Sequence, residues 1–201
     1  MNTIKLNTID VDIHTGNIGI SVSGGADSAI LLYMLMKYSS GTIHVYTCSS
    51  KEKNRVSPHI ALDVIGKCID LTGKQDVHHH TYFVEKQTYQ SWINGLINKP
   101  VDVMYTGVTA LPPDHVLATF SSQNDLYSKR DPNQVRPVRQ GKFYMPFFNL
   151  NKQQVCEVYK DLDMLEELYP LTRSCEDLKL TSGHCGSCWW CEERKWGFGK
   201  L

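Results

Sequence analysis

Apolar and polar residues alternate with two different periods along the first part of the chain. Every second residue from 9 to 13 is apolar, and a turn at 14–17 leads into the apolar run 18–22. This pattern predicts an N-terminal hairpin that continues into a buried strand. The run 28–38 is apolar almost throughout, and it predicts a buried helix that ends before Gly41.

Strand and helix patterns continue to alternate as far as residue 108. The further elements predicted are strands at 42–48, 77–84 and 101–108 and helices at 57–69 and 91–98. Helices of crossover length between successive strands imply a parallel sheet with helices on both faces. The expected fold class is therefore α/β, with a doubly wound parallel sheet.

The alternation stops between residues 109 and 141. This segment is polar and proline-containing, and it has no sustained period. A stretch of this length is typical of a functional lid or of a disordered loop, and both interpretations stay open. Its basic residues are Lys129, Arg130, Arg136 and Arg139. Beyond it, residues 143–148 predict an edge strand, and Asn151 is the expected N-cap of a further helix.

Composition excludes several classes of protein. The chain has 201 residues, which suits one domain with a small appendage, and its 21 basic and 21 acidic residues cancel. Neutral charge argues against an extended nucleic-acid surface. The sequence has neither the long apolar run of a membrane span nor an N-terminal secretory signal, so we expect a cytoplasmic protein. Four of the seven cysteines fall within residues 175–191, which indicates metal binding rather than disulfides.

A turn with two adjacent glycines separates the predicted strand at 18–22 from the predicted helix at 28–38. Gly24 and Gly25 let the backbone approach an anion closely, and the N–H groups at a helix start favour phosphate. Asp27 would repel phosphate unless a cation such as Mg²⁺ intervenes. The turn lacks the lysine of a Walker loop and the third glycine of a dinucleotide fingerprint. A purely structural turn is the alternative.

The C-terminal tail carries a second candidate site. Cys175, Cys185, Cys188 and Cys191 include two spacings typical of a tetrahedral zinc site. His184 is a substitute ligand, an iron–sulfur cluster is the competing interpretation, and reduced structural thiols are the third.

The segment Ser-Gly-Gly-Ala-Asp-Ser at 23–28 resembles the signature of the PP-loop ATP pyrophosphatases, also called adenine nucleotide alpha hydrolases. Tyr-Thr-Gly at 105–107 also occurs where that family has it. The resemblance implies a doubly wound sheet and cleavage of ATP between its α and β phosphates. The residues it assigns to ATP are Ser21, Ser23, Gly24, Gly25, Ala26, Asp27, Ser28 and Gly107.

Together with the tail, the loop resembles the 7-cyano-7-deazaguanine synthases of queuosine-precursor synthesis. The tail residues that carry this resemblance are Ser174, Cys175, Cys185, Gly186, Cys188, Cys191, Arg194 and Phe198. The resemblance implies an ATP-binding α/β domain at 1–170, with its N-terminal hairpin, and a zinc-binding tail at 171–201. It makes Asp27, Ser28 and Arg194 the catalytic residues, with ATP, Mg²⁺ and one Zn²⁺ per chain as cofactors.

The implied reaction converts 7-carboxy-7-deazaguanine and ammonia into the nitrile through an acyl-adenylate and an amide, releasing AMP and pyrophosphate. The implied partners are a deazaguanine-type acid and ammonia, with no membrane, and a homodimer is left open. The chain departs from the family at the N-terminal hairpin, at 107–116 and at 115–141, so the acid's identity stays open. A structural partnership of Arg194 with Glu192 or Asp177 is equally compatible with the sequence.

Three alternatives to this function remain. The first is a related PP-loop enzyme that amidates such an acid or attaches it to protein or DNA. The second is a sulfur-transfer enzyme, for which Cys48 and Cys68 are poor candidates because they lie inside predicted elements. The third is a non-enzymatic zinc module, which the intact loop at 23–28 disfavours.

Overall fold

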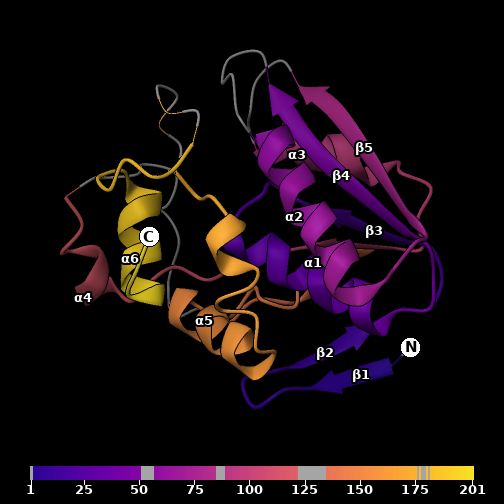
Figure 1. Ribbon diagram of the computed structural model, residues 1–201, viewed down its shortest axis with the longest axis horizontal. Coiled ribbons are helices and arrows are strands. Elements are labelled where there is room, and N and C mark those ends of the chain that lie inside the picture. Colours follow the sequence, from indigo (N-terminus) through magenta and orange to yellow (C-terminus); the bar gives the residue numbers. More distant parts are fainter. Residues whose placement is uncertain are drawn as a thin grey trace.

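The computed structural model describes residues 2–50, 57–84, 89–121, 135–175, 177, 180 and 182–201. Its centre is a six-stranded sheet in the order β5-β4-β3-β6-β8-β7 (Figure 1). The strands are β3 (Ile18–Ser21), β4 (Ile43–Ser50), β5 (Val77–Val84), β6 (Val103–Thr106), β7 (Arg139–Gln140) and β8 (Phe143–Tyr144). The helices are α1 (Ala26–Tyr38), α2 (Ser57–Thr72), α3 (Tyr89–Ile97), α4 (Asp114–Leu117), α5 (Lys152–Asp161) and α6 (Trp189–Phe198).

The five strands from β5 to β8 run parallel, and β7 alone pairs antiparallel with its neighbour. The predicted α/β class with a mostly parallel sheet is confirmed. From β3 the chain moves outward to β4 and β5, and then returns to β6 on the other side of β3. The strand order therefore reverses between β3 and β6, and ligands of open α/β sheets bind at such a switch point.

The core explains why α1 is apolar around most of its circumference. α1, α2 and α5 contribute to one large cluster with Ile18 and Ile20 of β3, whereas α3 packs in a separate small cluster with Tyr46 and Met104. α1 thus lies between the sheet and other helices, and a helix in that position buries nearly all its side chains. α5 and α6 pack together at the side of the molecule away from β4 and β5 (Figure 1).

The N-terminal hairpin differs from the prediction in its strand partner. β1 (Asn2–Lys5) pairs antiparallel with β2 (Asp10–Ile13), and β3 joins the large sheet. The prediction paired β2 with β3 and missed β1. Tyr105 of β6 donates to the carbonyl of Asp12, which fastens the hairpin to the central sheet.

Two predictions between residues 109 and 148 are also corrected. The segment 109–141 contains a short helix, α4, and β7, so its described part is not structureless; residues 122–134, with Lys129 and Arg130, lie outside the described residues. β8 lies inside the sheet between β6 and β7, not at its edge. Arg139 pairs with Asp12 of the hairpin at 2.9 Å, and the interpretation of 109–141 as a lid stays a prediction.

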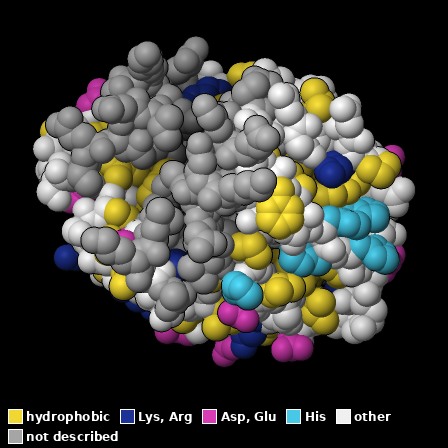
Figure 2. All heavy atoms as spheres, turned by 90° about the horizontal axis from the view of Figure 1, so that it is seen from above, with side chains coloured by type: hydrophobic (Ala, Val, Ile, Leu, Met, Phe, Trp, Pro, Cys, Tyr) yellow, Lys and Arg dark blue, Asp and Glu magenta, His cyan; other side chains and the backbone are white. Residues whose placement is uncertain are grey.

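One part of the sheet presents polar rings to solvent. Histidine side chains gather on one side of the molecule (Figure 2), and the ring of His44 stacks on those of His78 and His80 in β4 and β5. The chain at 78–80 is thus strand, in agreement with the sequence pattern. Among the described residues, no helix has the length and apolar character needed to span a membrane.

Candidate nucleotide site and metal centre

The Ser-Gly-Gly turn follows β3 directly and leads into α1. Gly24 has φ +83°, and a Cβ there would lie 2.7 Å from Cγ2 of Ile60 in α2. Both the backbone conformation and the space therefore require glycine. The carbonyl of Gly24 accepts a hydrogen bond from Arg173 N at 2.9 Å, so the turn is also held by the chain that leads to the cysteines.

The end of β6 touches the first turn of α1. A Cβ on Gly107 would lie 2.8 Å from the backbone N of Ser28 and 2.9 Å from the carbonyl carbon of Asp27. Any side chain at this position would separate β6 from α1. The two loops that flank the switch point therefore meet at Gly107.

The serines around the turn divide into two groups. Ser28 Oγ donates to the carbonyl of Gly25 at 3.1 Å and accepts from the backbone N of Ser23 at 3.3 Å, so this hydroxyl closes the loop. Ser21 Oγ instead accepts from Nε1 of Trp92 in α3 at 2.9 Å. Ser21 therefore faces the α3 side of the sheet in this structure, away from the start of α1.

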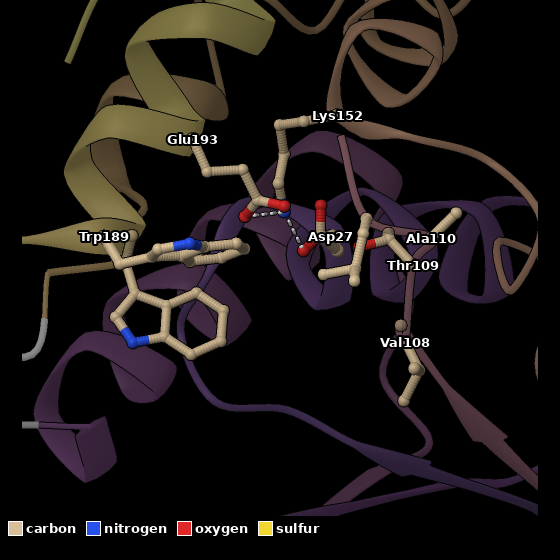
Figure 3. A pocket seen from close by; sticks show the side chains of 10 residues that line it. Asp27, Val108, Thr109, Ala110, Lys152, Trp189 and Glu193 are labelled. Atoms are coloured by element: carbon tan, nitrogen blue, oxygen red, sulfur yellow. Dashed lines mark hydrogen bonds and ion pairs between the residues drawn. The ribbon is translucent and has the colours of Figure 1, made fainter. Parts of the chain in front are cut away.

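A buried lysine that the sequence analysis missed lies beside the loop. Lys152 Nζ is 2.5 Å from Oδ2 of Asp27 and 3.4 Å from Oε2 of Glu193 (Figure 3). The side chains of Lys152 and Glu193 are only 5% and 4% exposed. Burial works against the charge, but the two carboxylates outweigh it and raise the pKa of Lys152. Lys152 is therefore a permanent cation at the loop.

The three charged groups line a cavity of 240 Å³. Residues 107–111 form one wall, and Trp189 and Trp190 at the start of α6 form another (Figure 3). Asp27 Oδ1 is buried and has no hydrogen-bond partner among the described residues. An unpartnered carboxylate oxygen at a cavity wall can accept a cation or a ligand N–H. Polar loops, a carboxylate and indole rings thus converge at the switch point.

Arg194 lies outside this cavity. Its side chain is buried, donates to Thr172 Oγ1 at 2.8 Å and to the carbonyl of Tyr169 at 3.2 Å, and stacks on the Tyr169 ring. Neither partner expected for a structural role, Glu192 or Asp177, supplies these bonds. The arrangement orders the chain that precedes Cys175, and the catalytic role assigned to Arg194 stays a prediction.

The four predicted cysteine ligands come together. The sulfurs of Cys175, Cys185, Cys188 and Cys191 all lie within 4.8 Å of one another. A tetrahedral zinc with Zn–S bonds of about 2.3 Å separates its sulfurs by about 3.8 Å. The distances of 3.9 Å for Cys185–Cys191 and 4.0 Å for Cys188–Cys175 fit this spacing. The cluster can therefore hold a metal ion.

The backbone around the cluster is arranged for thiolates. Gly186 has φ +79°, which lets the chain turn so that Cys188 N donates to Cys185 Sγ at 3.3 Å. Burial opposes ionisation of Cys185, but hydrogen bonds from the N–H groups of Ser187 and Cys188 and with the thiols of Cys175 and Cys188 outweigh it and lower the pKa of Cys185, whereas burial raises the pKa of Cys191. His184, the alternative ligand, is not part of the cluster.

The structure thus combines an α/β fold, built on a mostly parallel six-stranded sheet, with a cysteine cluster that fits a metal ion. Residues 113–201 match the family described as "Queuosine biosynthesis protein QueC". The match includes Lys152 and the four cysteines but does not reach the loop at 23–28. It confirms, from the C-terminal part of the chain, the resemblance to a QueC-like family. A search of curated proteins found no match.

Two of the similar solved structures have low sequence identity to this chain. NMN synthetase from Francisella tularensis is 15% identical, with 92% of this chain and 77% of that chain covered, at a TM-score of 0.44. The U34-tRNA thiolase NcsA from Methanococcus maripaludis, solved with its [4Fe-4S] cluster, is 12% identical, with 91% and 70% covered, at a TM-score of 0.40.

Proposed function

We propose that this protein is an ATP-dependent carbon–nitrogen ligase that converts a deazaguanine-type carboxylic acid and ammonia into the nitrile. The QueC family match supports the coarser statement, an ATP-using enzyme of the queuosine pathway. The observation that carries the proposal is that Asp27, which follows the Ser-Gly-Gly turn, meets Gly107 and buried Lys152 at one cavity of the switch point.

The proposed chemistry makes a poor electrophile reactive in two activation steps. The carboxylate oxygen attacks the α-phosphorus of ATP, and pyrophosphate leaves. Ammonia then attacks the acyl carbon, loses a proton, and displaces AMP to give the amide. The amide oxygen attacks the α-phosphorus of a second ATP and displaces a second pyrophosphate, and loss of both nitrogen protons and of AMP leaves the nitrile. In each activation step the carbon gains AMP as its leaving group in place of oxide, which is a much poorer one.

The chain's own groups suit the charge that develops in these steps. The backbone N–H groups at the start of α1 and the Lys152 ammonium provide positive charge for the departing pyrophosphate. Asp27 Oδ2 is occupied by Lys152, whereas the unpartnered Oδ1 is the atom that would hold Mg²⁺. The magnesium ion would neutralise phosphate charge beside Asp27.

A sulfur-transfer enzyme is less well supported. Such chemistry needs a reactive thiolate or an iron–sulfur cluster. Cys68 is fully buried, and burial raises the pKa of its thiol to about 12. Cys156 is also buried, and burial raises the pKa of its thiol too. Both thiols stay protonated at neutral pH, so neither is a competent nucleophile.

The proposed function is tested by the product. The protein is incubated with ATP, ammonium ion and 7-carboxy-7-deazaguanine, and the product is identified by mass spectrometry while ATP consumption is followed. We expect the nitrile as the product, with two molecules of ATP consumed for each molecule of nitrile formed. Acetate, which lacks the ring system, serves as the control acid. Accumulation of the amide with one ATP per product would favour the related amidating enzyme, and an unchanged acid would contradict the proposal.

The metal at the cysteine cluster is a separate prediction. We expect about one zinc per chain in the purified protein, because four thiolates at tetrahedral spacing suit Zn²⁺. Cys185→Ser should lose the zinc and lower the melting temperature, since metal binding contributes folding free energy. Cys48→Ser, which lies outside the cluster, is the control and should retain the zinc. Iron with inorganic sulfide in metal analysis would identify a cluster instead.

A further inference from the structure

A second cavity lies on the α3 face of the sheet, and the roles assigned above do not use it. Its volume is 270 Å³. α3 supplies Trp92, Ile93 and Ile97, and the segment around β8 supplies Phe143 and Met145. Ile97 is 49% exposed. The walls are therefore mostly apolar, and their largest ring belongs to a tryptophan whose indole N–H is already fixed by Ser21.

One polar atom in this apolar wall lacks a partner. Thr106, the last residue of β6, lines the cavity and is 1% exposed, and its Oγ1 makes no hydrogen bond among the described residues. A buried hydroxyl without a partner costs free energy, and native proteins rarely retain one without a reason. A ligand that donates to or accepts from Thr106 Oγ1 would remove this cost.

The cavity adjoins the nucleotide loop through the backbone. Thr106 is the register partner of Ser21 across β3 and β6, and Ser21 is two residues before Ser23. The next residue, Gly107, touches the first turn of α1 and lines the other cavity. The two cavities therefore approach the end of β6 from opposite faces of the sheet.

We propose that this second cavity binds the planar ring system of the carboxylic acid that ATP activates. The inference rests on the proposed function and adds the position of the substrate ring. A volume of 270 Å³ lies just below the range of about 300–1,000 Å³ that is usual for small-molecule sites, so it suits one ring system. Trp92 offers an aromatic face, and Thr106 offers one hydrogen bond to a ring edge.

The position also favours the acid over the adenine of ATP. In a ring acid such as 7-carboxy-7-deazaguanine the reacting carboxylate is attached directly to the ring, so the ring must lie beside the α-phosphate. Adenine is separated from that phosphate by a ribose. A cavity that begins one residue from Gly107, where β6 contacts the nucleotide loop, fits the shorter connection.

The test measures binding without turnover. Wild-type protein and Thr106→Val are titrated by calorimetry with 7-carboxy-7-deazaguanine and, separately, with ATP. The valine keeps the shape of the side chain and removes its hydroxyl. We expect about tenfold weaker binding of the acid and unchanged binding of ATP, as loss of one buried hydrogen bond implies. Ile93→Trp, which fills the cavity, should abolish acid binding and leave ATP binding intact.

The other outcomes overturn the inference in distinct ways. Thr109→Val makes the same change in the first cavity, and weaker acid binding in this variant alone would place the ring there. Weaker ATP binding in Thr106→Val would assign the cavity to adenine. If Thr106→Val, Ile93→Trp and the wild type bind the acid equally well, the second cavity does not bind its ring. Failure to form AMP would count against the proposed function and leave these binding results standing.

Discussion

Lys152→Met should lower the free energy of unfolding by about 3–5 kcal/mol, the usual cost of leaving a buried charge without its partner. The side chains of Lys152 and Glu193 are nearly inaccessible, and Lys152 bridges the carboxylates of Glu193 and Asp27. Methionine fills similar space but leaves Glu193 without that cation. In a chain of this size, the melting temperature should fall by roughly 6–20 °C.

The same helix provides a matched control for this substitution. Lys160 is exposed in the last turn of α5, where it pairs with Glu157 at 2.8 Å. Exposed pairs contribute little, so Lys160→Met should melt with the wild type. The double variant Lys152→Met/Glu193→Gln should recover part of the lost stability, because it removes the more deeply buried of the two carboxylates that lose Lys152. Equal melting temperatures for Lys152→Met and Lys160→Met would show that the buried pairs do not stabilise the fold.

Asp27→Asn should reduce the rate of adenylation by about 100- to 1000-fold, the usual effect of removing one preorganised charged group from an active site. The variant loses the carboxylate oxygen that would hold Mg²⁺, and it also loses the charge that holds Lys152. From the sequence, only the helix-dipole contribution of about 0.3–1 kcal/mol was expected for stability. Because Asp27 also pairs with Lys152, the expected loss of stability in Asp27→Asn increases to about 1.5–3 kcal/mol.

The rate and the melting curve are measured on the same Asp27→Asn sample. Asp114→Asn is the control, because Asp114 also lies in the first turn of a helix and is exposed on α4. It should keep both wild-type rate and wild-type stability. If Asp27→Asn retains more than about a tenth of the wild-type rate, Asp27 is a residue of the helix start and its assignment to the active site is wrong.

Local patterns in the sequence were sufficient for those parts of the site that are local in the chain. The turn at 23–28 follows a strand and opens a helix, as its glycines and serines predict. The four cysteines lie within seventeen residues, and their spacing predicts their convergence. In both cases the residues that act together are close in sequence, so their spacing is sufficient to predict how they are arranged.

The errors concern contacts between distant segments. Lys152 reaches Asp27 across 125 positions, and nothing in the sequence around Asn151 distinguishes this lysine from an exposed one. One feature of the sequence could have indicated such a lysine. The turn at 23–28 has no lysine of its own, so a cation beside it must come from a distant part of the chain. The hairpin was assigned to the wrong partner because alternation identifies strands but not their pairing.

The position of bond cleavage in ATP tests the central claim most directly. The protein is incubated with ATP, ammonium ion and the acid, and the nucleotides are separated by chromatography while pyrophosphate and phosphate are assayed. If the loop at 23–28 directs attack to the α-phosphorus, AMP and pyrophosphate should form in equal amounts and only when the acid is present. Stoichiometric ADP and phosphate would contradict the account.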